Sequence, residues 1–67
     1  MMTTTATDAI LESIAHNSIV TIDYTPEAEE TLLAECDDSA DTEETLEFWG
    51  CDEDGQSWRV HLAREAR

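Results

Sequence analysis

Residues 45–64, TLEFWGCDEDGQSWRVHLAR, predict a β-hairpin. Leu46, Phe48 and Gly50 fall on one side of a two-residue pattern, which is the period of a strand with one buried face. The second pattern has Trp58, Val60 and Leu62 on one side. Asp54 and Gly55 lie between the two runs and form a typical turn dipeptide. Because this stretch holds both tryptophans and the only phenylalanine, we expect the rest of the chain to pack against it.

The length of 67 residues fits one small domain. A chain this short buries only about 60% of the surface that its unfolded state exposes. Its core rarely supplies more than about 3–5 kcal/mol of net stability, so small domains often add a disulfide, a metal or a second subunit. A homodimer is therefore a candidate state, as is a complex with a protein partner.

The charge is strongly negative, with 17 Asp and Glu against 3 Lys and Arg and a net charge of −14. Repulsion among these carboxylates opposes compaction in ordinary buffer, where the Debye length is about 8 Å. At about 1 M salt the Debye length falls to about 3 Å, and most of this penalty disappears. The composition is typical of a halophile and predicts a cytoplasm with molar salt, such as that of haloarchaea.

Two other interpretations of the charge are less favoured. A disordered acidic tail needs low hydrophobicity, whereas 40% of this chain is hydrophobic and shows strand periodicity. An acidic DNA mimic gathers its carboxylates on one face, whereas here they are spread along the sequence. Three basic residues also argue against a basic surface that neutralises nucleic-acid phosphates.

Cys36 and Cys51 are the only cysteines. The sequence shows no secretory signal pattern and no apolar run near the roughly 20 residues of a membrane span. We expect a cytoplasmic protein with no membrane association, in which both thiols stay reduced and act as small apolar residues.

The first half of the chain predicts a helix and a strand. After a frayed N-terminus at residues 1–6, Thr7 is the expected N-cap of a helix that ends near His16, with Ile10, Leu11 and Ile14 as its apolar stripe. Residues 18–24, SIVTIDY, alternate and are rich in β-branched side chains, which predicts a strand.

Residues 26–36, PEAEETLLAEC, allow two interpretations. Thr25 as a cap, Pro26 as first residue and the early glutamates favour a helix. The alternative is a strand at residues 30–37, which we prefer because four strands leave fewer unpaired edges than three. Residues 37–44 are then an acidic loop, residues 65–67 a tail, and residues 7–64 a single domain.

Metal and catalytic sites are not expected. His16, Cys36, Cys51 and His61 have suitable side chains for zinc but lack the close pairs of structural zinc sites. Residues 52–55 lack the spacing of a calcium-binding loop, because the twelfth position from Asp52 is alanine. No nucleophile and base stand at a recognisable spacing, so we expect no enzyme, no metal and no cofactor.

The outward-facing side of the hairpin is the candidate interaction site. Arg59 alternates with the inward-facing Trp58 and Val60, which places it beside Trp49 and His61. Three interpretations stay open: a cross-strand Trp49–Arg59 pair or a bridge from Arg59 to Glu47, a surface that binds a partner, and a surface covered by the N-terminal helix.

Residues 9–24 and 46–65 resemble a stripped-down WYL domain, the small Sm/SH3-like barrel of many bacterial transcription regulators. Residues 57–64, SWRVHLAR, follow in part that family's strand of alternating arginine and aromatic or apolar residues, whereas Phe48-Trp49-Gly50 replaces the W-Y-L triplet. The resemblance implies that Trp49, Arg59, His61 and Arg64 sense a nucleotide or nucleic-acid ligand.

We therefore predict an α+β fold in which a short N-terminal helix packs on a four-stranded, twisted antiparallel sheet, with a small barrel as the alternative form. The expected core consists of apolar side chains from every predicted element: Ile10, Leu11, Ile14, Val20, Ile22, Tyr24, Leu32, Ala34, Leu46, Phe48, Trp58, Val60 and Leu62. The expected function is a non-enzymatic interaction or regulatory module that binds itself or a protein partner, and a WYL-like sensor of a nucleotide or RNA is the alternative.

Overall fold

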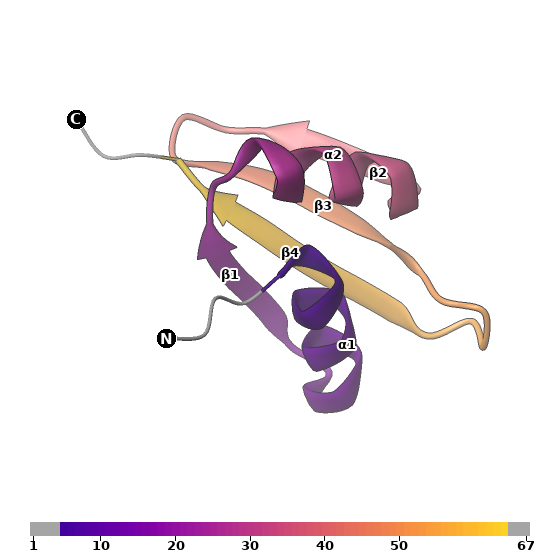
Figure 1. Cartoon of the computed structure of the whole chain (residues 1–67). Helices are drawn as coiled ribbons and strands as arrows, with labels where there is room; N and C mark the ends of the chain where they lie inside the picture. Colours follow the sequence, from indigo (N-terminus) through magenta and orange to yellow (C-terminus); the bar gives the residue numbers. More distant parts are fainter. Residues whose placement is uncertain (1–4, 65–67) are drawn as a thin grey trace.

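The computed structural model describes residues 5–64, which form two helices and a four-stranded sheet (Figure 1). Along the chain the elements are α1 (Ala6–His16), β1 (Ile19–Asp23), α2 (Pro26–Glu35), β2 (Asp38–Asp41), β3 (Thr45–Cys51) and β4 (Ser57–Ala63). The strands lie in the order β1-β4-β3-β2. The predicted termini at residues 1–4 and 65–67 lie outside the described residues.

The sheet is mixed, so the α+β class is confirmed but the prediction of an antiparallel sheet was wrong. β3 pairs antiparallel with both β4 and β2, whereas β1 pairs parallel with β4. The reason is that α2 carries the chain from one edge of the sheet to the other, and such a crossover lets the first strand run parallel to its neighbour. β1 and β2 are the two edges, and no pairing within residues 5–64 closes the sheet into a barrel.

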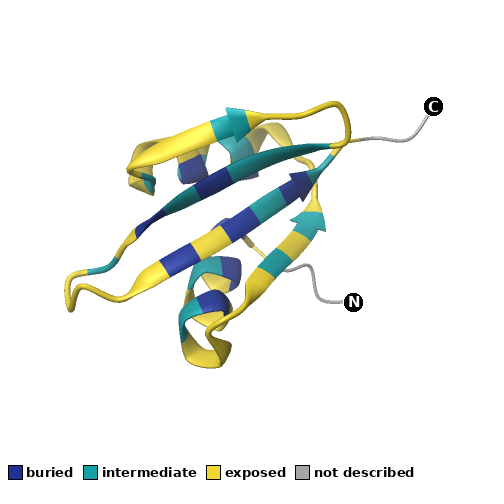
Figure 2. Cartoon of the chain, turned by 180° about the vertical axis from the view of Figure 1, so that it is seen from behind, coloured by how far each residue is buried: buried dark blue, intermediate teal, exposed yellow. Residues whose placement is uncertain are grey.

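Both helices cover the same face of the sheet (Figures 1 and 2). Ala9 of α1 and Leu32 of α2 share one buried cluster with Phe48 and Val60 from the central strands. The opposite face, drawn toward the viewer in Figure 2, is therefore not covered by either helix, and the interpretation that the N-terminal helix covers Arg59 was wrong.

The predicted hairpin is confirmed, with β3 and β4 joined by a tight loop. The N–H of Asp52 donates to the carbonyl of Gln56 at 2.9 Å, and the N–H of Gly55 donates to the carbonyl of Asp52 at 3.0 Å. Gly55 has φ +83, the left-handed conformation that glycine adopts without strain. Oδ1 of Asp52 also accepts the N–H groups of Asp54 and Gln56, which closes the loop.

Helix α1 begins two residues earlier than predicted. Oγ1 of Thr5, not Thr7, accepts the N–H of Asp8 at 3.1 Å and caps the helix, because Thr5 has the extended backbone of an N-cap. Thr5 thus caps α1 and Ala6 begins it, although the sequence predicted a frayed end there. The helix ends as predicted near His16, with Asn17 in the left-handed conformation.

The side of α1 that contacts the sheet differs from the predicted stripe. Its buried residues are Ala6, Ala9 and Ser13, with Ile10 and Ile14 partly buried beside them. Leu11 is 60% exposed, so its assignment to the core was wrong. Periodicity marks the large apolar residues, but small side chains allow the closest approach of a helix to a sheet.

Residues 26–35 form helix α2, and the preferred strand was wrong. Oγ1 of Thr25 accepts the N–H of Ala28 at 3.0 Å, and Pro26 begins the helix. Leu32 is fully buried and Ala28 nearly so, whereas Ala34 is exposed. The helix signals at Thr25 and Pro26 therefore predicted this segment correctly, whereas the argument from unpaired sheet edges did not.

The fourth strand comes from the segment that was predicted to be a loop. β2 pairs with β3, with Asp38 opposite Trp49 and Ala40 opposite Glu47. β2 lies at the sheet edge, where most of its side chains meet solvent, so its sequence DSAD shows no apolar alternation. The backbone of β3 rather than hydrophobicity holds it in place.

The core matches the prediction at its centre. Fully or nearly fully buried predicted residues are Leu32, Phe48, Trp58, Val60 and Leu62, and partly buried ones are Ile10, Ile14, Val20, Ile22 and Leu46. Tyr24 was wrongly included: it follows the end of β1 and is 39% exposed.

Gly50 allows β3 to pass close to the segment between α2 and β2. A Cβ atom at Gly50 would lie 3.1 Å from the backbone nitrogen of Asp37 and 3.1 Å from the ring of Trp58. The indole of Trp58 packs over the glycine in place of a side chain, so the close contact between β3 and this segment depends on glycine.

Candidate interaction surface

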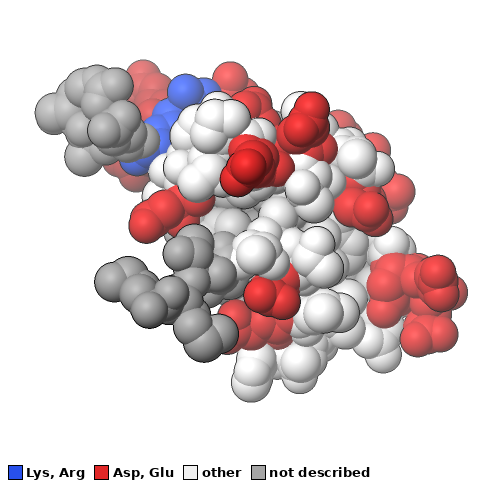
Figure 3. Space-filling view, in the orientation of Figure 1, with Lys and Arg blue, Asp and Glu red and all other residues white. Residues whose placement is uncertain are grey.

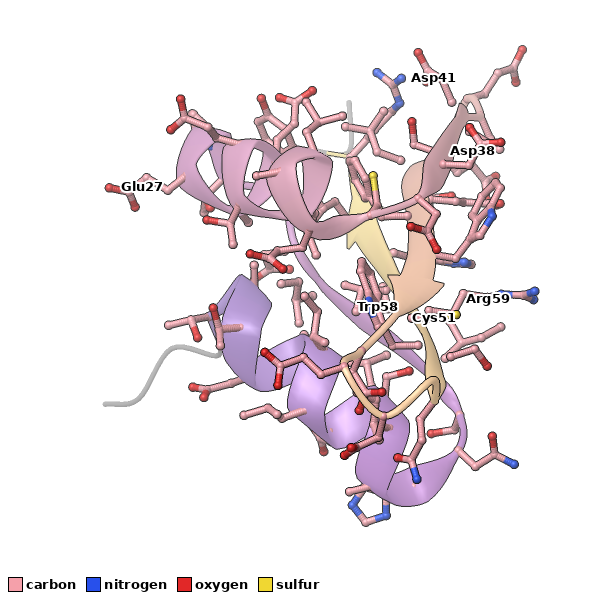
Figure 4. The ribbon with its side chains drawn as sticks, turned by 90° about the vertical axis from the view of Figure 1, so that its right-hand side faces the viewer. Glu27, Asp38, Asp41, Cys51, Trp58 and Arg59 are labelled. Carbon is pink, nitrogen blue, oxygen red and sulfur yellow. The ribbon has the colours of Figure 1, made fainter. Side chains whose placement is uncertain are left out.

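We define the outer face as the side of the sheet turned away from both helices. By register and alternation it carries Ile19, Thr21, Asp23, Asp38, Ala40, Thr45, Glu47, Trp49, Cys51, Ser57, Arg59, His61 and Ala63. Figure 4 shows the consequence for two successive residues: Trp58 points toward the helices, whereas Arg59 points away from them.

Trp49 and Arg59 lie directly opposite each other on β3 and β4. The N–H of Arg59 donates to Oγ of Ser13, on the side away from β3. The two residues therefore form a pair without mutual backbone hydrogen bonds, in which the Cα atoms are about 4.5 Å apart and the side chains come close. This geometry suits a cation–π contact worth about 0.5–1 kcal/mol at an exposed site.

The row through this pair continues across all four strands. Ile19 of β1 lies beside Arg59, and Asp38 of β2 lies beside Trp49. Ile19 is 50% exposed, so it adds an apolar side chain to the surface beside Arg59. Sequence reasoning missed Ile19 and Asp38 as neighbours of the pair, because it predicted neither the parallel pairing of β1 nor the strand β2.

His61 lies in the next row, between Thr21 of β1 and Glu47 of β3. It is half-buried, as Trp49 and Glu47 are. The register places Glu47 opposite His61 rather than opposite Arg59, so of the two cross-strand pairs considered for Arg59 the geometry favours Trp49.

Arg64 lies apart from the other three predicted site residues. It follows the end of β4, five residues beyond Arg59 and so roughly 17 Å along the strand direction. Its guanidinium pairs with the carboxylate of Asp41, and its Nε donates to the carbonyl of Thr42 at 2.9 Å. The structure thus brings Trp49, Arg59 and His61 together, whereas Arg64 holds the connection between β2 and β3.

A shallow groove of about 360 Å³ lies at the end of the sheet where β1 and β4 begin. Its walls include Ile19, Trp49 and Arg59 from the outer face and Asn17 and Ser18 from the turn after α1. Its volume falls within the range of small-molecule sites.

The carboxylates are unevenly distributed over the elements. Thirteen of the 17 acidic residues lie in residues 27–54, which cover α2, β2, β3 and the hairpin loop. Helix α1 and strand β1 together carry only Asp8, Glu12 and Asp23. Figure 3, which shows the face that carries the helices, has acidic side chains scattered over this face with uncharged side chains between them.

The cysteines and histidines do not form a metal site in the described part of the chain. Within residues 5–64 no three His, Cys, Asp or Glu side chains are grouped as metal ligands. Both thiols are free, with Cys51 exposed and Cys36 partly buried. Burial raises the pKa of the Cys36 thiol, which lowers its reactivity as a nucleophile at neutral pH.

Comparisons with known protein families, curated proteins and solved structures found no match. The case for a function therefore rests on the chemistry of the outer face. Within residues 5–64 no helix is long and apolar enough to cross a membrane.

Proposed function

We propose that the protein is a non-enzymatic interaction or regulatory module of a halophile, which binds a protein partner or a second copy of itself through the outer face. One observation carries the proposal: Trp49 and Arg59 are direct neighbours on a sheet face that neither helix covers. Tryptophan and arginine are enriched at the energetic centres of protein interfaces. The excess of 17 acidic over 3 basic residues supports a cell interior of high salt.

The charges on the outer face favour a different protein over a second copy. Asp38 and Glu47 lie next to the Trp49–Arg59 pair and Asp23 lies farther along the same face, so two outer faces pressed together would bring carboxylates close to carboxylates. A partner with an apolar or aromatic anchor for Trp49 and a basic rim for the flanking carboxylates fits this surface.

A displayed peptide library, selected for binding in about 2 M potassium chloride, tests the proposal. We expect the selected peptides to bind Trp49→Ala at least about 30-fold more weakly than wild type, because centres of binding energy contribute about 2 kcal/mol or more. Leu33→Ala is the matched control, since Leu33 is 53% exposed on α2 and lies outside the outer face. Equal binding of the peptides to wild type and Trp49→Ala would contradict the proposal.

The second candidate is a WYL-like sensor of a nucleotide or oligonucleotide. The groove supports it, because Trp49 offers a surface on which a base can stack and Arg59 offers a cation for a phosphate. Titration of nucleotides and short RNA at molar salt, followed by NMR, should then shift the signals of Trp49 and Arg59. Unchanged signals throughout the titration would exclude this candidate.

A further inference from the structure

Strand β1 is a sheet edge with unpaired backbone groups. It pairs with β4 alone, and the N–H of Tyr24, just after it, donates to the carbonyl of Ala63 at 3.2 Å (Figures 1 and 2). Because backbone groups of successive strand residues point to opposite sides, Val20 and Ile22 also face β4. The N–H and C=O groups of Ile19, Thr21 and Asp23 therefore point away from the sheet, and no residue in 5–64 pairs with them.

The two edges of the sheet differ sharply in charge. β2 carries Asp38 and Asp41 and lies in the segment that holds thirteen of the 17 acidic residues. Charged side chains on an edge strand prevent pairing with another chain. β1, IVTID, has one carboxylate at its end, and it is preceded by the uncharged Asn17 and Ser18. Two copies of a chain with net charge −14 can therefore approach with least repulsion at β1.

We propose that β1 pairs antiparallel with β1 of a second copy, with Thr21 on the two-fold axis. In this register Thr21 lies opposite its own copy and Ile19 lies opposite Asp23 of the second copy. All six free backbone groups of each edge then find partners. If one strand were shifted by two residues relative to the other, some of these backbone groups of β1 would have no partner in β1 of the second copy.

Side chains on both faces agree with this register. On the helix side Val20 lies opposite Ile22 of the second copy, and both are only partly buried in the single chain. An apolar cross-strand pair of this kind stabilises a sheet. The two Asp23 carboxylates lie four residues apart along the strands, about 13 Å, which exceeds the Debye length of about 3 Å at 1 M salt.

The resulting dimer has a continuous sheet of eight strands with one extended outer face. Five strand spacings, about 24 Å, separate β3 from its copy, and Trp49 and its copy are also offset by about 13 Å along the strands. The dimer does not depend on the proposed function, but it presents the Trp49–Arg59 pair twice on one side. A partner with two matching sites would bind such a surface with higher avidity than a monomer.

Sedimentation equilibrium in about 2 M potassium chloride tests the dimer on wild type, Thr21→Pro and Ser39→Pro. Proline at Thr21 removes an N–H that faces outward, which an edge strand tolerates, and we expect dimerisation about 100-fold weaker from the loss of two symmetric bonds. Ser39 is the matched position on the other edge, because its N–H donates to Oδ1 of Asp38 rather than to β3. Ser39→Pro should stay dimeric, and circular dichroism checks that both variants fold.

If Thr21→Pro does not fold, amide hydrogen exchange of the wild type tests the β1 dimer instead. We expect the amides of Ile19, Thr21 and Asp23 to be protected at millimolar concentration and to lose protection on dilution, whereas those of Val20 and Ile22 stay protected at both concentrations. A monomer at millimolar concentration, or a dimer that leaves these three amides unprotected, would overturn the proposal. The two proposals fail separately, because Trp49→Ala should weaken peptide binding to the outer face and leave this dimer intact.

Discussion

The hydroxyl of Tyr24 donates a hydrogen bond of 2.8 Å to Oε1 of Glu29 at the surface, between the end of β1 and α2. This hydrogen bond is the main reason that the pKa of Tyr24 is raised above its ordinary value of about 10, and the negative charge of Glu29 adds to it. Since the pKa in the folded state exceeds that in the unfolded state, the bond stabilises the fold below about pH 10. Its contribution is lost as the pH rises through the folded-state pKa.

We predict that Glu29→Ala lowers the pKa of Tyr24 toward its ordinary value, because it removes both the acceptor and the charge. Tyr24 is the only tyrosine, so the ultraviolet absorbance of tyrosinate during an alkaline titration reports it alone. Glu27→Ala is the control, since Glu27 is an exposed residue of the same helix that points to solvent (Figure 4), whereas the hydroxyl of Tyr24 donates to Glu29. A titration curve unchanged by Glu29→Ala would show that the bond does not form in solution.

At the scale of elements, Ser13 joins α1 to the sheet. Its side chain is 2% exposed. Oγ accepts the N–H of Arg59 at 2.9 Å and donates to the carbonyl of Ser18 at 2.6 Å. Ser18 precedes β1, which pairs with β4 from Ile19 opposite Arg59 onward. The hydroxyl therefore takes the place of a direct ladder bond at the point where the parallel pairing begins.

We predict that Ser13→Ala lowers the free energy of unfolding by about 1–3 kcal/mol, because it removes the hydroxyl that links the partly buried N–H of Arg59 to the carbonyl of Ser18. Urea unfolding followed by tryptophan fluorescence, in about 2 M potassium chloride, measures the change. Ser18→Ala is the control and should change stability by less than about 0.5 kcal/mol, because Ser18 is exposed and its hydrogen bonds to Ser13 come from its backbone N–H and C=O. Equal effects of the two substitutions would mean that Ser13 contributes no more to the free energy of unfolding than a surface serine does.

Repulsion among the carboxylates of the whole chain opposes the fold. Helix α2 alone carries four glutamates, and none of its last-turn residues is basic. Screening by salt weakens this repulsion over distances longer than the Debye length, which falls from about 10 Å at 0.1 M to about 3 Å at 1 M. The net charge of −14 therefore links stability to ionic strength.

We predict a larger free energy of unfolding in about 2 M than in about 0.1 M potassium chloride, measured by urea unfolding. Replacing the exposed Glu27, Glu30 and Glu35 by glutamine changes the net charge from −14 to −11 and should reduce this difference. Equal stability of the wild type in both salts would contradict the halophilic interpretation.

The hairpin, the helix at α1 and the centre of the core followed from local patterns in the sequence. Alternation fixes which face of β3 and β4 is buried, and Asp54-Gly55 fixes where they turn, because both depend on residues close together in the chain. The same alternation placed Trp49, Arg59 and His61 on one face before the fold was known. The cap residue Thr25 and the first helical residue Pro26 also predicted α2, although the preferred prediction for this segment was a strand.

The way in which distant segments meet could not be predicted from local sequence patterns. Whether β1 runs parallel or antiparallel to β4 depends on where α2 carries the chain, and β2 is a strand because β3 offers it backbone partners, although its side chains show no strand pattern. The burial of Ala6, Ala9 and Ser13 likewise follows from the close approach of α1 to the sheet. The positions of Ile19 and Asp38 on the outer face also depend on distant segments. Their neighbours Arg59 and Trp49 are more than ten residues away in sequence, and periodicity does not predict which strands pair over such distances.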